Sequence, residues 1–369
     1  MDHTSFNQII IDILVIFAVL GAFDRITLGK FKLGLAESFE EGFEALGTLA
    51  LSMLGILALA PVLPKVLLPA VGPVYRLLGA DPAMIAGTLL SSDMGAYPLA
   101  MGMTEDRAVG CFSGIILGCL LGIVIVFTIP IALGIIKPED RAFLAEGVLY
   151  GIITVPIGCF AGGIAAGYSL GMIFHNTVPT IIIAVLLALG IKFVPNKMIA
   201  GFQVFAKIVV MIITFGLICA MIEALSGITI IKGMAPISEG FEVIGEIAIV
   251  LAGAFPLVSV VTRCFKKQFI RIGSKAGMNE NSVAGLVASL ANIIPMCGLM
   301  KDMDERGKIV NSAFAVSGSL ILGDHLAFTA SVEKELIFPM MAAKATAGIC
   351  AVILALIVTR KRYGKVQQH

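Results

Sequence analysis

The feature that most constrains this chain is a series of eleven apolar stretches, most of them about twenty residues long, bounded by charges, prolines or glycines. A helix of about 20 residues crosses the ~30 Å hydrocarbon core of a bilayer. An open sheet cannot lie there, because its unpaired backbone groups would find no hydrogen-bond partner. The sequence therefore predicts an all-α polytopic integral membrane protein. The stretches cover residues 9–23, 43–63, 82–103, 108–136, 144–168, 178–194, 202–222, 241–261, 282–300, 309–330 and 336–358.

Composition and motif content exclude the main soluble classes. Of the 369 residues, 58% are hydrophobic and 14% are charged, whereas a soluble domain has about 25% charged residues. A formal net charge of +1 provides no basic field for nucleic acid. The seven cysteines have no CxxC or zinc spacing, and no GxSxG, HExxH or P-loop motif occurs. We therefore expect no metal site, no cofactor, no catalytic residue and no nucleic-acid partner.

Two of the stretches, the third and the ninth, carry helix-breaking residues near their centres. The third contains SSDMGAYP from Ser91 to Pro98, and the ninth contains NIIP from Asn292 to Pro295. Proline removes a backbone donor, glycine disfavours a helix, and Ser, Asp and Asn compete for backbone hydrogen bonds. Each stretch is therefore predicted to form two half-helices that meet at a polar, unwound tip.

The basic residues indicate how many stretches cross the membrane. If all eleven crossed, the two richest basic clusters would face opposite sides, against the positive-inside rule. If the third and ninth stretches are re-entrant, nine crossings remain, both clusters are cytoplasmic, the N-terminus is external and the C-terminus is cytoplasmic. Lys65 and Arg76 then lie outside, which argues against this arrangement, and eleven crossings remain the alternative. The clusters are Arg263, Lys266, Lys267, Arg271 and Lys275, and Arg360, Lys361, Arg362 and Lys365.

The chain also repeats itself. EGFEALG from Glu41 returns as EGFEVIG from Glu239, an offset of 198, and 13 of the 51 positions from 41 to 91 are identical at that offset. With nine crossings, five separate the repeat starts, so the copies are inverted, as in secondary transporters that bind substrate at broken helices. With eleven crossings they are parallel. The predicted parts are repeat 1 (1–170, re-entrant segment 82–103), a connecting transmembrane helix (171–198), and repeat 2 (199–369, re-entrant segment 280–300) with a cytoplasmic basic tail.

Polar residues at the two breaks are the first candidates for a binding site. An ionisable group in the bilayer costs at least about 2.5–3.5 kcal/mol, so it needs a partner or a role. Asp93, with Ser92 and Tyr97 beside it, is suited to a cationic ligand that also contacts an aromatic ring. The alternative is that Asp93 caps a half-helix. Asn292, near the matching position, either binds a hydroxyl group or caps the second half-helix.

Four further ionisable residues need an explanation. Asp324 and His325 either complete the site or relay protons, or form a solvated helix end. Lys344 is expected to be structural or gating, in a buried ion pair with an acidic residue such as Asp324. Asp12, in the short first stretch, either has the same gating or ion-pair role or lies at a water-facing helix end.

Long motifs throughout the chain resemble one known family. They are APVLPKVLLPAVGPVY (60–75), AGTLLSSDMGAYPLA (86–100), GFQVFAK (201–207), DERGKIVNSAFAVSGSLILGDHLAF (304–328) and IFPM (337–340). Together they resemble the ethanolamine-utilisation membrane protein family, EutH, over nearly the whole chain. The resemblance implies an ethanolamine permease of the bacterial inner membrane, which works beside enzymes that degrade ethanolamine.

These observations lead to one expected function and two alternatives. We expect uptake of ethanolamine, a small protonated amino-alcohol, by facilitated diffusion or secondary transport. The alternatives are a membrane enzyme acting on amino-alcohols and a secondary transporter of a different small cation. The expected partners are ethanolamine and the lipid bilayer, and assembly into a homo-oligomer is left open. The expected substrate-binding residues are Asp93, Tyr97, Ser92, Asn292, Asp324 and His325.

Overall fold

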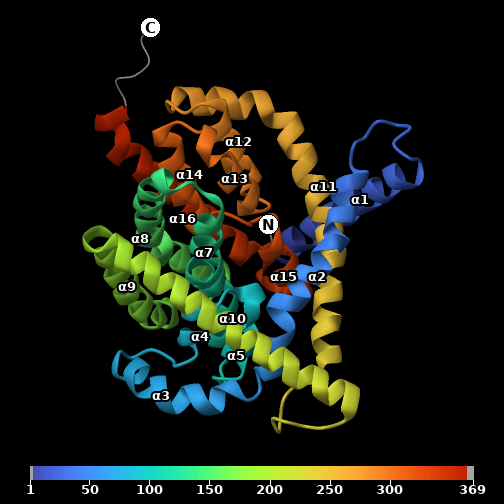
Figure 1. Cartoon of the computed structure of the whole chain (residues 1–369), viewed down its shortest axis with the longest axis vertical. Coiled ribbons are helices and arrows are strands. Elements are labelled where there is room, and N and C mark those ends of the chain that lie inside the picture. The colour runs from blue at the N-terminus through green and yellow to red at the C-terminus, as the bar shows by residue number, and fades with distance from the viewer. Residues whose placement is uncertain (1–2, 364–369) are drawn as a thin grey trace.

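The computed structural model describes residues 3–363, and this part of the chain contains helices, turns and loops but no β-strand (Figure 1). The all-α class is therefore confirmed. Lys365 of the predicted basic tail lies outside the described residues. The elements, with η marking short π-helical or 3-10 segments, are α1 (His3–Ile26), α2 (Ala36–Leu59), α3 (Leu63–Leu77), α4 (Met84–Leu89), η1 (Ser92–Ala96), α5 (Tyr97–Met101), α6 (Arg107–Cys111), η2 (Phe112–Gly122), η3 (Val124–Thr128), α7 (Ile129–Ile135), η4 (Pro138–Asp140), α8 (Arg141–Ala165), α9 (Leu170–Phe193), α10 (Pro195–Ser226), α11 (Ile237–Lys275), α12 (Glu280–Ala288), α13 (Ile293–Leu299), η5 (Met300–Asp302), α14 (Glu305–Ser317), α15 (Asp324–Val332), η6 (Lys334–Leu336) and α16 (Ile337–Tyr363).

Seven helical segments of the described chain are long and apolar enough to cross a membrane. All seven correspond to crossings expected from the sequence, which confirms a polytopic membrane protein. The other two expected crossings correspond to α1 and to the α14–α15 pair, so the total of nine stays a prediction. The seven segments are Ala36–Leu59, Arg107–Ile135, Pro138–Ala165, Leu170–Phe193, Pro195–Ser226, Ile237–Lys275 and Lys334–Arg360.

Both predicted helix breaks are confirmed. Between α4 and η1 the backbone is extended at Leu90 and Ser91, with ψ angles of 149° and 152°. Asn292 is likewise extended before α13, with φ −153° and ψ 146°. α4 packs against α5, and α12 packs against α13, so each segment folds back on itself as a hairpin. Entry and exit of each hairpin on the same side of the membrane stays a prediction.

A third break lies within residues 309–330. The expectation of one unbroken helix there is wrong, whereas the crossing itself stays a prediction. α14 ends at Ser317 and α15 begins at Asp324, with turns between them. The unwound backbone is satisfied by the tip of the second hairpin, because the N–H of Leu320 donates to the Ser289 carbonyl (2.8 Å) and that of Leu322 to the Leu290 carbonyl (2.9 Å). Non-helical backbone is tolerated at this depth only where protein groups supply such partners.

Two segments that separate predicted apolar stretches are helical. The basic cluster from Arg263 to Lys275 continues α11, which has 39 residues, because Lys and Arg are good helix formers. His175, which lies between the stretches 144–168 and 178–194, is part of α9. The Ser169 hydroxyl caps the start of this helix by accepting a hydrogen bond from the Met172 N–H (3.3 Å).

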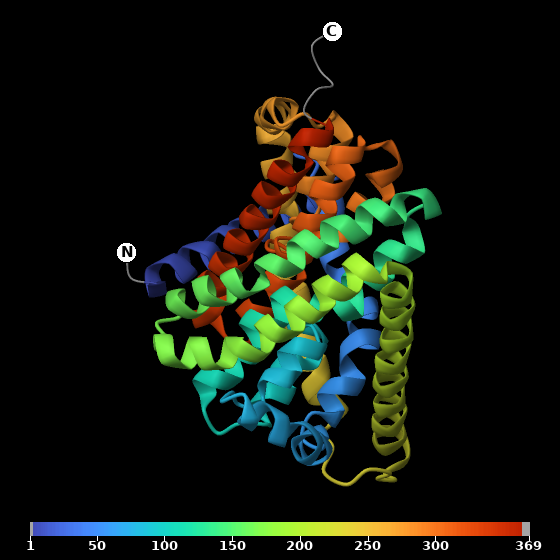
Figure 2. The ribbon, with the colours of Figure 1, turned by 90° about the vertical axis from the view of Figure 1, so that its left-hand side faces the viewer.

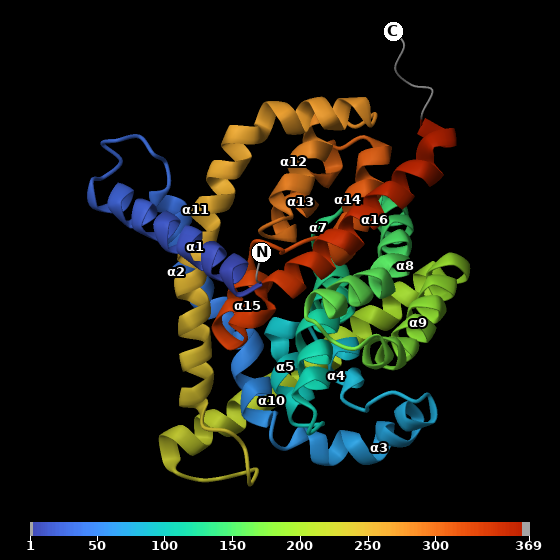
Figure 3. The ribbon, with the colours of Figure 1, turned by 180° about the vertical axis from the view of Figure 1, so that it is seen from behind.

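The short helix α3 accounts for the two basic residues that disagreed with the nine-crossing arrangement. It has 15 residues, about 22 Å at 1.5 Å per residue, too short to cross a bilayer. It lies across one end of the molecule (Figures 1 and 3). Its large apolar side chains Val66, Val74 and Leu77 are exposed, together with Lys65 and Arg76. Apolar and basic side chains on one exposed helix are typical of a helix that lies in the membrane interface.

The two ends of the molecule differ in charge. The α11–α12 turn and the end of α16 lie at one end, and α3 and the α10–α11 connection lie at the other (Figures 2 and 3). The two richest basic clusters are therefore at the same end. This placement favours nine crossings over eleven, which would have separated them.

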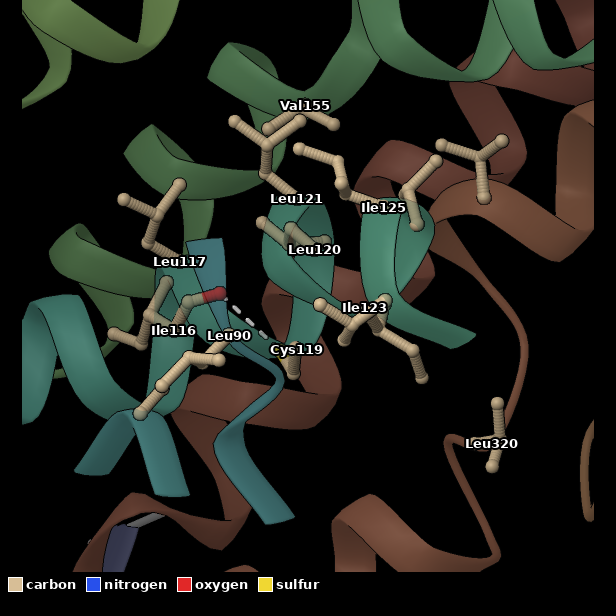
Figure 4. Close-up of a cluster of buried hydrophobic side chains, with 14 of the residues drawn as sticks. Leu90, Ile116, Leu117, Cys119, Leu120, Leu121, Ile123, Ile125, Val155 and Leu320 are labelled. Carbon is tan, nitrogen blue, oxygen red and sulfur yellow. Dashed lines mark hydrogen bonds between the residues drawn. The ribbon is translucent and has the colours of Figure 1, made fainter. Parts of the chain in front are cut away.

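The centre of the molecule is η2, all of whose eleven residues are buried. Gly114, Gly118 and Gly122 recur at every fourth position, and the first hairpin packs against them. A Cβ atom at Gly122 would lie 1.8 Å from the Leu90 carbonyl oxygen, so only glycine allows this approach. On another side of η2, Leu121 lies beside Val155 of α8 (Figure 4). Close helix packing through small residues is the usual solution inside a bilayer.

Candidate functional site

The first broken helix and the third one meet at a buried Asp–His pair. His325 Nε2 lies 3.6 Å from Asp93 Oδ1 and 3.2 Å from the Ser91 hydroxyl oxygen. The Ser91 hydroxyl in turn donates to Asp93 Oδ1. Asp93 is 8% exposed, and Ser91 and His325 are fully buried. The structure thus joins two of the residues that the sequence selected, Asp93 and His325, and adds Ser91 to them.

Local backbone geometry holds this centre between the two hairpin tips. Gly95, with φ +97°, turns the chain just after Asp93 in a conformation that favours glycine. A Cβ atom at Gly323 would lie 2.0 Å from the Ala291 carbonyl oxygen, so glycine there allows α15 to begin directly against the second hairpin. His325 in the first turn of α15 is thereby directed at the first hairpin.

Two polar atoms of this centre are buried without a hydrogen-bond partner in the described chain: the Ser92 hydroxyl oxygen and Nδ1 of His325. Most buried polar side-chain atoms have a partner, and an unsatisfied one costs about 1–3 kcal/mol. His325 faces the Asp93 carboxylate, and Ser92 directly precedes Asp93 in the chain. The centre therefore offers one carboxylate together with polar atoms able to bind a ligand that carries both an ammonium and a hydroxyl group.

Lys344 binds a different group from the acidic residue that was expected. Its side chain is fully buried, and Nζ donates to the backbone carbonyl of Cys119 at 2.7 Å. The suggested ion pair between Lys344 and Asp324 is not formed, because η2 presents a carbonyl oxygen where α16 packs against it. Asp324 is half-buried at the start of α15, beside His325.

Tyr97 belongs to a second polar cluster about one turn away from Asp93. Its hydroxyl donates to Glu333 Oε1 (2.6 Å), and Arg107 donates to Glu333 Oε2 (2.7 Å). The Tyr97 ring packs edge-on against Phe328 of α15, with 6.2 Å between centroids. Sequence reasoning missed Glu333 and Arg107, since both lie between the apolar stretches and not inside them. The signal that could have revealed them is a charged residue in a short segment between two apolar stretches.

A cavity of about 680 Å³ leads to this second cluster. The first turns of α1 and α6, the end of α8 and the start of α16 surround it. Every one of these segments is predicted to lie on the external side. Among its lining residues are Asn7, Gln8, Arg107, Tyr168, Glu333 and Glu335.

The structure does not bring Asn292 or Asp12 to the Asp93 centre. The Asn292 side chain caps α13, since its Oδ1 accepts from the Ile294 N–H at 2.9 Å, and it lines a separate cavity of about 410 Å³ with Ser38 and Glu41. Its extended backbone directly before a helix is N-cap geometry. Asp12 is exposed on α1 and accepts a hydrogen bond from Gln8 Nε2 at 2.8 Å.

Comparison with known proteins covers almost the full length of the chain. Residues 6–358 match a family model described as "Ethanolamine utilisation protein, EutH". The chain is 54% identical over 361 residues to the "Probable ethanolamine permease EutH" of Listeria monocytogenes serotype 1/2a (strain 10403S), covering 98% of this chain and 96% of that protein. It is 47% identical over 391 residues to the protein of the same name from Escherichia coli (strain K12), covering 96% of each.

A further relative has no function in its name. The chain is 44% identical over 363 residues to the "Uncharacterized protein YxeR" of Bacillus subtilis (strain 168), covering 98% of each. No solved structure matches the chain.

Proposed function

We propose that this chain, which belongs to the EutH family of ethanolamine utilisation proteins, carries ethanolamine across the bacterial inner membrane into the cell as a small protonated amino-alcohol. Relatives that cover nearly its whole length are named probable ethanolamine permeases. The observation that carries the proposal is the Asp93 carboxylate, buried between two broken helices and paired with His325.

The chemistry of the centre suits this substrate. At neutral pH ethanolamine is mostly an ammonium with one hydroxyl group. The Asp93 carboxylate supplies the charge for the ammonium, and the unpartnered Ser92 hydroxyl and His325 Nδ1 supply hydrogen-bond partners for the hydroxyl. Broken helices that meet inside the bilayer are where secondary transporters bind their substrates.

We propose transport rather than catalysis on the ligand. Each group at the centre acts as a charge or a hydrogen-bond partner, and the relatives named for a function are named permeases. Facilitated diffusion and secondary transport differ in whether an imposed pH or Na⁺ gradient drives accumulation. Ethanolamine recovered chemically unchanged after uptake supports transport, and a modified product supports the membrane enzyme instead.

We further propose that the transporter consists of two inverted repeats, 1–170 and 199–369, with the N-terminus external and the C-terminus cytoplasmic. Several features recur at the offset of 198. Gly79 and Gly277 both have φ +73° at a helix end. Asp106 and Asp304 both cap the helix that follows a hairpin, α6 and α14. These pairs support a repeat in conformation as well as in sequence.

The proposal is tested with the purified chain in proteoliposomes and labelled ethanolamine. We expect saturable uptake by the unmodified chain, and we expect Asp93→Asn to lose it, because the amide has no charge for the ammonium. Asp12→Asn is the matched control, since that carboxylate is exposed on α1. Absence of uptake by the unmodified chain would contradict transport, and normal uptake by Asp93→Asn would remove Asp93 from the site.

A further inference from the structure

A second buried carboxylate, outside the Asp93 centre, faces the large cavity. Glu333 ends α15, its side chain is 9% exposed, and it lines the cavity of about 680 Å³. Both of its oxygens are occupied, Oε1 by the Tyr97 hydroxyl and Oε2 by Arg107. A buried carboxylate needs a cation or several hydrogen bonds, because the desolvation of the charge is costly.

The cation paired with Glu333 is Arg107, a residue at the surface. The Arg107 side chain is 64% exposed, and Glu333 is its hydrogen-bonding partner in the described chain. An exposed guanidinium gains little from a single ion pair, so it is readily displaced by another cation. The Glu333 carboxylate, by contrast, is buried, and leaving it without a cation would be costly.

We propose that Glu333 is a cation-binding subsite at the entrance of the pathway, which Arg107 occupies when substrate is absent and which the ammonium of incoming ethanolamine then takes over. This inference rests on the proposed transport function. The exchange replaces one monovalent cation with another, so the buried carboxylate is paired before and after it. Tyr168 also lines the cavity, and its ring provides a face for a small ammonium.

The subsite is connected to the buried centre through Tyr97. The Tyr97 hydroxyl binds Glu333, and its ring packs on Phe328, about one turn after His325 on α15. Asp93 lies about one turn before Tyr97 on the first hairpin. A change in the partner of Glu333 is therefore transmitted to both helices that form the Asp93–His325 pair.

The kinetics of ethanolamine uptake in proteoliposomes distinguish this role from a structural one. Glu333→Gln is expected to raise KM by about tenfold or more, the loss that one charge-assisted hydrogen bond carries. Arg107→Gln is expected to lower KM, because the ammonium no longer competes with a tethered cation. If the pair only holds the fold together, both changes impair uptake in the same direction, and that result would overturn the inference.

The control is Glu335→Gln. Glu335 is exposed at the same cavity, and its backbone carbonyl accepts a hydrogen bond from Asn7 Nδ2 (2.9 Å). Its substitution is expected to leave KM unchanged. A rise in KM equal to that of Glu333→Gln would mean that general negative charge, rather than the subsite, attracts the ammonium.

A second measurement does not depend on the folding of Glu333→Gln. Methylguanidinium imitates the end of the Arg107 side chain, so it is expected to inhibit ethanolamine uptake more strongly in Arg107→Gln than in the unmodified chain. Equal inhibition of the two chains contradicts the subsite. Lack of uptake by the unmodified chain instead contradicts the transport function, so the two failures are distinguishable.

Discussion

At the scale of single residues, the proposed binding site consists of buried polar groups. The sequence identified Asp93, His325 and Lys344 as residues that need partners, because ionisable groups inside a bilayer are costly. It did not identify the partners. Lys344 binds a backbone carbonyl, that of Cys119, and every residue has a carbonyl, so no sequence pattern marks this one. Glu333 was missed because it lies in the short segment between two apolar stretches.

His325 is expected to be required for uptake at its normal rate. His325→Ala leaves Asp93 with Ser91 as its side-chain partner, and we expect kcat/KM for ethanolamine to fall by about tenfold or more, as for the loss of a hydrogen bond to a charged group. The measurement is initial uptake in proteoliposomes. His175→Ala, in the exposed first part of α9, is the control. Unchanged uptake by His325→Ala would exclude the Asp–His pair from the transport path.

Lys344 is expected to stabilise the packing of α16 on η2. Lys344→Met keeps the length of the side chain but leaves the Cys119 carbonyl without its partner, a loss of about 1–3 kcal/mol. We expect a lower melting temperature of the detergent-solubilised chain, measured by size-exclusion chromatography after heating. Asp324→Asn is expected to keep the melting temperature, because no ion pair with Lys344 exists to be lost. A lower melting temperature for Asp324→Asn than for Lys344→Met would support the ion pair suggested by the sequence.

At the scale of elements, the broken helices are held by close backbone contacts. The first two breaks were predictable because Pro, Gly and polar residues interrupt apolar stretches there. The third was not, because the residues between Gly318 and Gly323 are mainly apolar and continue the hydropathy of a crossing. Their unwinding depends on the backbone carbonyls of Ser289 and Leu290, which accept hydrogen bonds at the tip of the second hairpin. Leu320 there has φ +57°, a conformation that costs a non-glycine residue about 1–2 kcal/mol.

The glycines of η2 are expected to fix the position of the first hairpin. Gly122→Ala places a Cβ atom against the Leu90 carbonyl, so we expect a lower melting temperature and reduced ethanolamine uptake. Gly134→Ala, in α7 of the same helical run, is the matched control, since a Cβ atom at Gly134 would have no neighbouring atom within 4 Å in the described chain. That change is expected to be neutral or stabilising by up to about 1 kcal/mol. Equal effects of the two substitutions would show that hairpin contact is not the cause.

At the scale of the whole molecule, the two richest basic clusters lie at one end. The basic end of α11 and the end of α16 lie together, and α3 and the α10–α11 connection lie at the opposite end (Figures 2 and 3). The cavity at Glu333 lies among segments predicted to be external, and Tyr97 connects Glu333 with the hairpin that carries Asp93. In the proposed orientation the basic end faces the cytoplasm, in agreement with the positive-inside rule.

The exposed Cys264 tests this orientation directly. It lies in the basic part of α11, and five of the other six cysteines are buried. We expect a membrane-impermeant maleimide to label Cys264 in inside-out vesicles but not in intact cells, and Cys264→Ser to lose that labelling. Labelling of Cys264 in intact cells would reverse the proposed orientation.

The sequence by itself determined the membrane class, the two hairpin breaks and the need of Asp93 for a partner, because hydropathy and helix breaking act locally along the chain. Only the tertiary structure decided which groups meet. Ser91 with His325, Lys344 with Cys119 and Tyr97 with Glu333 are separated by 225 to 236 positions. Such pairs arise from the packing of whole helices, which depends on many glycine contacts at once and leaves no pattern at either residue alone.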